Sequence, residues 1–257
     1  AIIKIINSGN GLIICGRLNQ QEQRDFTPAV SLLAEQLHCP ILVDPLSNLR
    51  FNTSSQNTVY NYDHSLKQSI VPKPEWIIRF GQFPVSKALL NYLQSLNSTT
   101  ILISSYGDTL DPIHSANSVL TMLPVEFCNA IVNNSVTARS KDWLTHWQQI
   151  EQQAEKKIAQ SLSSAANNTH FFEGHIIHSL LKHIPDKSIL FSANSMAIRD
   201  FDTFITHSSA SGKQLDFFAN RGTSGIDGNV STFFGLLASQ SHYAIALLGD
   251  LSFYHDM

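Results

Sequence analysis

The stretch 220–235, NRGTSGIDGNVSTFFG, contains the residues whose types and spacing most directly predict binding chemistry. Its glycines recur at every third residue, at Gly222, Gly225 and Gly228, directly after Arg221. Glycines let backbone N–H groups approach a ligand closely, and the amino end of a helix favours negative charge. Because the stretch joins an expected strand to an expected helix, it predicts an anion site at a sheet edge. The alternative is a tight structural turn.

A second stretch, ANSMAIRD (193–200), also follows an expected strand. Ser195 and Arg199 are four residues apart at a helix start, so a helix places both on one face. A hydroxyl and a guanidinium together suit a carboxylate or a phosphate. The alternative is a helix cap formed by Asn194 or Ser195, with the arginine in solvent.

The third stretch, YAIALLGD (243–250), is an apolar run that ends in Gly249 and Asp250. An aspartate at the carboxyl end of a strand suits a hard cation such as Mg²⁺. A single carboxylate cannot hold the ion by itself, so further ligands must come from elsewhere. The alternative is an isolated turn aspartate.

Other patterns favour structural explanations. The glycines of GNGLIICG (9–16) surround a strand instead of following it, and Ile14 stands where a dinucleotide fingerprint needs its third glycine. Three histidines share an expected helix with Glu173, namely His170, His175 and His178. They lack the HExxH spacing of a zinc site, so surface histidines are the better explanation. The sequence has no G-x-S-x-G nucleophile motif.

Composition limits the class of protein. Of 257 residues, 43% are hydrophobic and 14% charged, which predicts a globular chain with a substantial core. The net charge of −3, without any basic run, argues against nucleic acid as a partner. No apolar run approaches the roughly 20 residues of a membrane span, and no signal peptide opens the chain. Three well-separated cysteines (Cys15, Cys39 and Cys128) favour a cytoplasmic location without disulfides.

The hydrophobic pattern predicts an α/β fold. Short continuous apolar runs alternate with helical patterns, which is typical of parallel strands covered by helices on both faces. In the first part of the chain, strands are expected at 11–16, 40–44, 75–81, 99–105 and 119–123, and helices at 21–38, 59–70 and 85–96. We therefore expect two Rossmann-like parallel-sheet units.

The second unit is expected to follow a long helix. Residues 141–162 carry an apolar stripe at helical spacing, and the small polar residues 163–169 then predict a linker. Strands are expected beyond it at 188–193, 216–220 and 243–250. We predict a central α/β domain at 1–162 and a second domain at 163–257.

Together, NSMAIRD, NRGTSGIDG and LLGD, in this order and at these separations, resemble the MenD family. These are the 2-succinyl-5-enolpyruvyl-6-hydroxy-3-cyclohexene-1-carboxylate synthases, thiamine-diphosphate enzymes of menaquinone biosynthesis. IIRFGQFPVSKALLNYL (77–93) is similar to the family's central domain, and DWLTHW (142–147) to its linker helix. The resemblance covers essentially the whole chain, as the middle domain plus the first half of the diphosphate-binding domain.

The resemblance implies thiamine diphosphate and Mg²⁺ or Mn²⁺ as cofactors. Asp250 would bind the metal, Gly249 would lie beside the diphosphate, and Ile226 would lie beneath the thiazolium ring. Related thiamine enzymes usually read GDG at this point, whereas this chain reads GDL, as MenD-like proteins also do.

The resemblance also implies the substrates 2-oxoglutarate and isochorismate. The family decarboxylates the first and adds the resulting succinyl carbanion to the second, with the thiazolium as electron sink. Both substrates are dicarboxylates, and four side chains would bind their carboxylates: Lys87, Ser195, Arg199 and Arg221. Some relatives carry a basic residue after the lysine, and Ala88 stands there in this chain.

Catalysis in this family needs parts that the resemblance places outside the chain. These are a glutamate from an N-terminal domain and the rest of the diphosphate-binding domain. We therefore assign no catalytic residue, and expect a truncated piece, inactive alone, of a homodimeric or homotetrameric enzyme.

Three alternatives remain open at this point. One is another thiamine-diphosphate enzyme, such as an acetolactate-synthase-like protein, whose monocarboxylate substrate would not need so many basic residues. Another is a non-catalytic α/β nucleotide-binding module, which the absence of a dinucleotide or P-loop fingerprint disfavours. The last is an α/β scaffold with surface arginines, which leaves the three candidate anion sites at strand ends unexplained.

Overall fold

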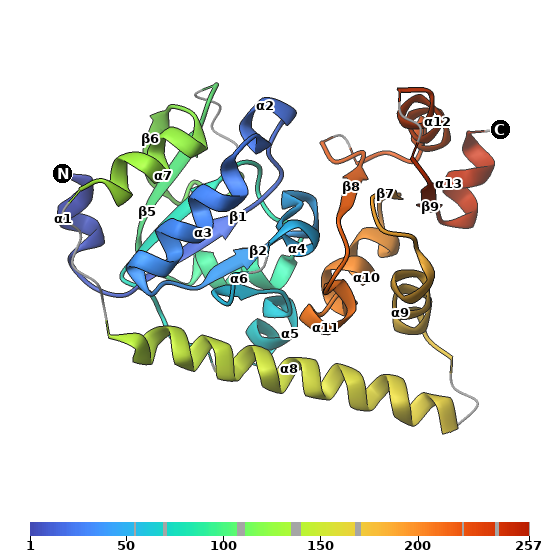
Figure 1. The fold of residues 1–257 in the computed structure, drawn as a ribbon, viewed down its shortest axis with the longest axis horizontal. Coiled ribbons are helices and arrows are strands. Elements are labelled where there is room, and N and C mark those ends of the chain that lie inside the picture. Colours follow the sequence, from blue (N-terminus) through green and yellow to red (C-terminus); the bar gives the residue numbers. More distant parts are fainter. Residues whose placement is uncertain are drawn as a thin grey trace.

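The computed structural model describes residues 1–53, 55–68, 71–106, 111–134, 140–167, 171–222, 224–239 and 242–256. Two parallel β-sheets, each packed against helices, lie side by side, and the long helix α8 (Lys141–Asn167) runs along both (Figure 1). This arrangement confirms the predicted α/β class. Within the described part of the chain, no helix is both long and apolar enough to cross a membrane.

The first sheet has six parallel strands in the order β3-β2-β1-β4-β5-β6. The strands are β1 (Gly11–Cys15), β2 (Ile41–Val43), β3 (Thr58–Val59), β4 (Trp76–Phe80), β5 (Thr99–Ser104) and β6 (Ala116–Thr121). The order changes direction between β1 and β4, which defines a doubly wound sheet. All five predicted strands are present, and β3 was not predicted because a two-residue strand is too short to show periodicity.

The helices of the first unit are α1 (Ile2–Ile6), α2 (Gln20–Gln23), α3 (Phe26–Leu37), the 3₁₀ turn η1 (Pro45–Ser47), α4 (Leu49–Asn52), α5 (Tyr62–Lys67), α6 (Lys87–Gln94) and α7 (Pro124–Val132). The helix expected over 59–70 was therefore wrong at its start, where Val59 pairs with Leu42 in the sheet instead. The other end of that expectation, 69–70, lies outside the described residues.

Alternation along β1 explains why helices cover both faces of the first sheet. Successive strand residues point to opposite faces. Ile13 and Cys15 enter one hydrophobic core with Val30 of α3. Leu12 and Ile14 enter the other core, which contains residues of α6 and α8. Every residue of β1 is buried, and the strand is apolar throughout because both of its faces contact a hydrophobic core.

Helix α8 packs through the apolar stripe that the sequence predicts. Trp147 is fully buried, and the indole nitrogen of Trp143 donates to the carbonyl oxygen of Gly11 at 2.8 Å. The helix continues through 163–167, so part of the expected linker is helical. The next residues, 168–170, include His170 and lie outside the described residues. The domain boundary at 162 stays a prediction.

The second sheet is smaller, with parallel strands in the order β8-β7-β9. Its strands are β7 (Ser188–Ser192), β8 (Leu215–Ala219) and β9 (Ala244–Leu247). Its helices are α9 (Glu173–His183), α10 (Met196–Phe204), α11 (His207–Ala210), α12 (Asn229–Ser239) and α13 (Asp250–His255). Strand β9 ends three positions before Asp250, which begins a helix instead of ending the strand as predicted.

The two units are joined along strand β8, at the edge of the second sheet. The side-chain oxygen of Asn48 accepts a hydrogen bond from the backbone N–H of Phe217 at 2.6 Å. The side-chain amide of Asn52 donates to the carbonyl oxygen of Leu215 at 3.1 Å. These two amides occupy backbone groups that a neighbouring strand would otherwise bind, so the edge of β8 is docked onto the first unit.

Candidate functional site

The three predicted stretches meet at one edge of the second sheet. Because all its strands are parallel, their carboxyl ends lie together, followed by Ser195 after β7, Arg221 after β8 and Asp250 after β9. The backbone N–H of Ala193 donates to the carbonyl oxygen of Leu247 at 2.9 Å, so the ends of β7 and β9 are adjacent. Open α/β folds bind ligands beyond the carboxyl ends of the strands where the strand order changes direction, which in this sheet is at β7 and β9.

Ser195 has an unusual backbone conformation directly before helix α10. Its φ of 66° and ψ of −127° lie in a region that side-chain-bearing residues rarely adopt, at a cost of about 1–3 kcal/mol. Its hydroxyl does not cap helix α10, so the amino end of that helix lacks the side-chain cap considered as the alternative. Arg199 is exposed, and its guanidinium contacts the sulfur of Met196 at 3.8 Å. Both predicted residues therefore remain accessible.

Asn194, which the sequence analysis considered only as a helix cap, holds the glycine-rich loop. Its amide nitrogen donates to the carbonyl oxygens of Asn220 at 2.9 Å and Gly225 at 2.8 Å. Its amide oxygen accepts from the guanidinium of Arg221 at 3.4 Å. Because Asn194 directly precedes Ser195, one buried side chain connects the two predicted anion-binding stretches.

Two glycines of this loop are explained by their backbone angles and not by a neighbouring atom that would exclude a side chain. Gly222 and Gly228 have φ values of 145° and 75°, which favour glycine, and a Cβ at either would meet no atom within 4 Å. Gly225 has neither a positive φ nor a close neighbour. The loop therefore leaves open space beside it, as a binding loop needs.

The amino end of α12 faces an anion that the chain itself supplies. The carboxylate of Asp256 accepts from the backbone N–H groups of Gly228 at 2.8 Å and Ser231 at 3.1 Å, and also from that of Val230. Desolvation opposes ionisation of Asp256, but these donors outweigh it and lower the pKa of the carboxyl. The sequence analysis did not single out Asp256, because its distance from the loop concealed the contact.

The backbone of Ile226 is held by the buried side-chain amide of Asn229, which also binds helix α13. The carbonyl oxygen of Ile226 accepts from the amide of Asn229 at 2.8 Å and from the hydroxyl of Ser252 at 3.2 Å. Asn229 in turn donates to Ser252 at 2.8 Å and is fully buried. Since Ser252 lies two residues after Asp250 in helix α13, the network links the backbone of Ile226 to the helix that carries that carboxylate.

Asp250 begins helix α13 and is exposed, with Gly249 as the helix cap. Within the described residues its carboxylate has no hydrogen bond or ion pair, so its oxygens are free for a cation. No cluster of three or more His, Cys, Asp or Glu side chains is placed to hold a metal in the described part of the chain. One carboxylate suits Mg²⁺ when phosphate oxygens and water complete the shell, so the donor set fits a phosphate-bound Mg²⁺.

Lys87 begins helix α6 of the first unit and is exposed. Val85, two residues before Lys87, donates its N–H to the carboxylate of Asp44 at 2.7 Å. Burial raises the pKa of Asp44, while the Val85 and Leu46 N–H groups and the positive charges of Arg50 and Arg221 lower it. Asp44 therefore binds the segment that precedes Lys87, and in the described residues no hydrogen bond or ion pair joins Lys87 itself to Ser195, Arg221 or Asp250.

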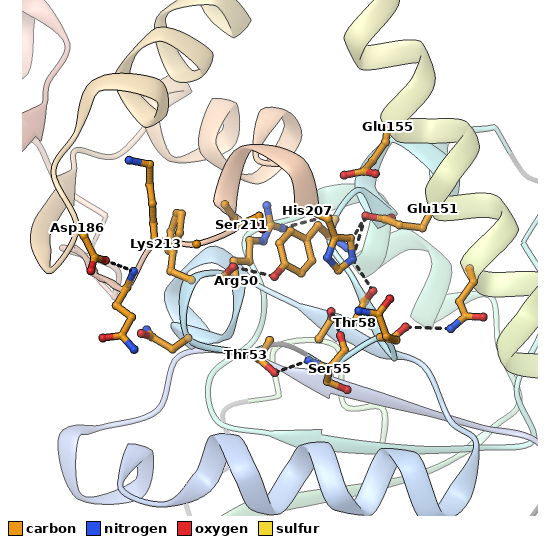
Figure 2. Close-up of a pocket in the computed structure, with 18 of the residues that line it drawn as sticks. Arg50, Thr53, Ser55, Thr58, Glu151, Glu155, Asp186, His207, Ser211 and Lys213 are labelled. Atoms are coloured by element: carbon orange, nitrogen blue, oxygen red, sulfur yellow. Dashed lines mark hydrogen bonds and ion pairs between the residues drawn. The ribbon is translucent and has the colours of Figure 1, made fainter.

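A separate cavity of about 1020 Å³ lies between α8, the segment around Thr53–Tyr60 and the α11–β8 connection (Figure 2). None of the predicted site residues lines it. Its buried carboxylate, Glu151, accepts from the backbone N–H groups of Tyr60 at 2.9 Å and Asn61 at 3.0 Å. His207 stacks on Tyr60 with ring centroids 3.9 Å apart. These groups are already bonded within the protein, so they join the units structurally.

Comparison with known proteins agrees with this geometry. A family model described as the middle domain of thiamine pyrophosphate matches residues 3–192. The chain belongs to this thiamine-pyrophosphate middle-domain family. The match covers the first sheet and α8 and extends to the end of β7, so β8 and β9 lie beyond it.

Curated relatives are similar along essentially the whole chain. Three are named 2-succinyl-5-enolpyruvyl-6-hydroxy-3-cyclohexene-1-carboxylate synthase. The protein of Bacillus pumilus is 36% identical over 262 residues, and the match covers 100% of this chain. The protein of Dechloromonas aromatica is 35% identical over 257 residues, and that of Desulfitobacterium hafniense is 36% identical over 258 residues. Each of these two matches covers 98% of this chain. The chain spans 43% or 44% of the length of these relatives.

Proposed function

We propose that the protein containing this chain is a thiamine-diphosphate-dependent synthase that decarboxylates 2-oxoglutarate and joins the remaining succinyl group to isochorismate. The observation that carries the proposal is the convergence of Ser195, Arg221 and Asp250 at the carboxyl ends of three adjacent strands. The similarity to the named synthases supports the choice of reaction.

The diphosphate end of the cofactor fits the crevice beyond β7 and β9. Asp250 would hold Mg²⁺ or Mn²⁺ with its free carboxylate, Gly249 would lie beside the diphosphate, and Ile226 would support the ring system. When bound, thiamine diphosphate supplies the electron sink for loss of carbon dioxide from a 2-oxo acid. The hydrogen bonds of Asn229 and Ser252 to the carbonyl of Ile226 support this role, because they hold its backbone in place.

The substrates need fixed positive charge, because each is a dicarboxylate. Arg221 and Arg199 would bind carboxylates from the second sheet, and Lys87 from the first. Ser195 would donate a hydroxyl hydrogen bond to the same groups. Binding groups that are already in position lower the entropic cost of bringing two substrates together. Guanidinium groups also stabilise negative charge that develops near the reacting carbon. The small Ala88 adds no cation of its own.

We also propose that the whole protein works as a homodimer or homotetramer, as the resemblance implies. A cytoplasmic location is supported by the three cysteines, Cys15, Cys39 and Cys128, which are buried and free.

Release of carbon dioxide from 2-oxoglutarate by the full-length protein tests the function. We expect release that requires thiamine diphosphate and Mg²⁺ and that consumes isochorismate in equal amount. Pyruvate in place of 2-oxoglutarate is the matched comparison. Turnover of pyruvate with none of 2-oxoglutarate would replace the proposed function by an acetolactate-synthase-like one. Absence of turnover with either would reject a decarboxylating synthase.

A further inference from the structure

Arg17, which follows β1 in the first sheet, has a rigidly held backbone. Two glycines let the loops after β1 and β4 touch. A Cβ on Gly16 would lie 1.8 Å from the carbonyl oxygen of Gln82, and one on Gly81 would lie 2.4 Å from that of Arg17. The N–H of Gln82 donates to the carbonyl oxygen of Arg17 at 2.9 Å. The position of Arg17 is therefore set before any ligand arrives.

The side chain of Arg17 crosses from the first sheet to the second. Its Nη1 donates to the carbonyl oxygen of Ala219 at 3.4 Å and to that of Arg221 at 3.3 Å. These carbonyls belong to the end of β8 and the start of the glycine-rich loop. The contacts hold the guanidinium of Arg17 beside the segment that carries Arg221.

Both contacts come from Nη1, and among the described residues the Nε and Nη2 donors have no hydrogen-bond acceptor. That remaining edge is the fork that binds a carboxylate through two parallel hydrogen bonds. Among the described residues, no carboxylate forms an ion pair with Arg17, which is half-buried. A half-buried guanidinium without an acidic partner, at the rim of a predicted anion site, has its charge available to a ligand.

We propose that Arg17 binds a carboxylate group of an anionic substrate through its Nε/Nη2 edge, alongside Arg221. This inference rests on the proposed function and adds a residue from the first sheet to the substrate site. The substrate site then has one guanidinium from each unit, Arg17 and Arg221. Because Arg17 also contacts the second unit, substrate binding depends on how the two units are docked. Arg17 is a binding residue and has no role in proton transfer.

The test uses the full-length protein with three variants. Arg17→Gln removes the charge, and Arg17→Lys keeps the charge without the fork. Arg24→Gln is the matched control, because Arg24 is exposed and its one ion pair among the described residues is with Asp25 at 3.8 Å. Succinate, a dicarboxylate without a reactive ketone, is the calorimetric probe. Affinity for thiamine diphosphate and the KM and kcat for 2-oxoglutarate and isochorismate are measured in parallel.

We expect Arg17→Gln to weaken succinate binding and to raise the KM of at least one substrate roughly ten- to hundred-fold. Affinity for thiamine diphosphate should stay within about two-fold, because the changed donors face substrate. Arg17→Lys should fall between wild type and Arg17→Gln, and Arg24→Gln should match wild type. Equal losses of succinate and cofactor affinity would mean that Arg17 only holds the loop, and unchanged succinate affinity would also overturn the proposal.

The outcomes separate this proposal from the proposed function. If wild type turns over 2-oxoglutarate and Arg17→Gln has unchanged KM values and succinate affinity, the function stands and the role of Arg17 is rejected. If wild type does not turn over 2-oxoglutarate while Arg17→Gln loses succinate affinity, the carboxylate site stands and the reaction is rejected. A wild-type protein that binds no succinate overturns the role of Arg17.

Discussion

The guanidinium of Arg17 donates a hydrogen bond to the carbonyl oxygen of Arg221 at 3.3 Å, across 204 positions of sequence. Through this contact the carboxyl edge of the first sheet touches the glycine-rich loop of the second. Asn48 and Asn52 dock strand β8 onto the same unit. The position of Arg221 therefore depends on the first unit as well as on its own loop.

Replacing Asp250 by asparagine should weaken cofactor binding without affecting the fold. We expect the full-length Asp250→Asn protein to bind thiamine diphosphate with Mg²⁺ at least about ten-fold more weakly, because the neutral amide is a poor ligand for a hard cation. Its free energy of unfolding should change by less than about 0.5 kcal/mol, since the side chain is exposed. Calorimetric titration measures the first quantity and urea denaturation the second.

The matched control for this experiment is Asp227→Asn. Asp227 is an aspartate of the neighbouring loop with a side chain 86% exposed, so its replacement should leave cofactor affinity unchanged. Wild-type affinity in Asp250→Asn would remove Asp250 from the metal site.

Replacing Ser195 by glycine should stabilise the protein and impair substrate binding. The backbone angles of Ser195 cost a side-chain-bearing residue about 1–3 kcal/mol, whereas glycine adopts them freely and loses about 0.5–1 kcal/mol through greater unfolded-state entropy. We expect a net gain of about 1 kcal/mol in the free energy of unfolding, measured by urea denaturation.

Ser211→Gly is the control for the relief of backbone strain by glycine. Ser211 has a φ of −57° and ψ of 134°, which are ordinary, so glycine there should give no gain. A loss of stability in Ser195→Gly equal to that in Ser211→Gly would show that Ser195 is unstrained. A lower affinity for 2-oxoglutarate in the more stable variant would indicate that the strain serves binding.

Replacing Arg50 by methionine should strongly destabilise the protein. Arg50 is 1% exposed and donates to the carbonyl oxygens of Val43, Tyr60 and Phe201 and to the carboxylate of Asp202 at 2.6 Å. Its loss leaves a buried carboxylate without its charge partner, which typically costs about 3–5 kcal/mol.

Urea denaturation of Arg50→Met, Arg50→Lys and Arg24→Met measures this cost. The lysine variant should lie between wild type and Arg50→Met, because it keeps the charge but not the planar array of donors. Arg24→Met should change the free energy of unfolding by less than about 0.5 kcal/mol, since its ion pair is exposed. A loss below about 1 kcal/mol in Arg50→Met would contradict a structural role for this network.

Glu151 should make stability depend on pH. Burial raises the pKa of Glu151 to about 7, from a reference of 4.5, despite the N–H groups of Tyr60 and Asn61 that lower it. Because the folded state holds the proton more tightly than the unfolded state, stability from this group is full below about 4.5 and is lost as pH rises to about 7. The loss is at most roughly 3 kcal/mol.

The comparison of wild type with Glu151→Gln isolates this effect, since glutamine does not titrate. The difference between their free energies of unfolding should shift in favour of the glutamine variant between pH 5 and pH 7, by urea denaturation at each pH. The exposed Glu35→Gln is the control and should show no such shift. A difference that stays constant with pH would mean that Glu151 is ionised throughout this range.

Several helices and strands could be predicted because the residue pattern that indicates each one lies within its own segment. The run GLIIC in β1 is buried at every residue, and such a run indicates a strand without any knowledge of its neighbours. Helix α8 was found from its apolar stripe, although its end was set too early because small polar residues 163–167 are compatible with both helix and linker. Helix α1 and strand β3 were missed because each is too short to display a period.

The candidate site divides in the same way. Ser195, Arg221 and Asp250 could be proposed from the sequence, because strand-to-helix turns carry local signals, whereas Lys87 followed only from the family resemblance. The partners of those groups could not be. Asp256 at the amino end of α12, Asn194 across the loop and Arg17 beside Arg221 are contacts made at long sequence separation. Only the packing of strands, and of one sheet against the other, decides such contacts, because hydrogen bonds depend on distances in space that local residue patterns do not encode.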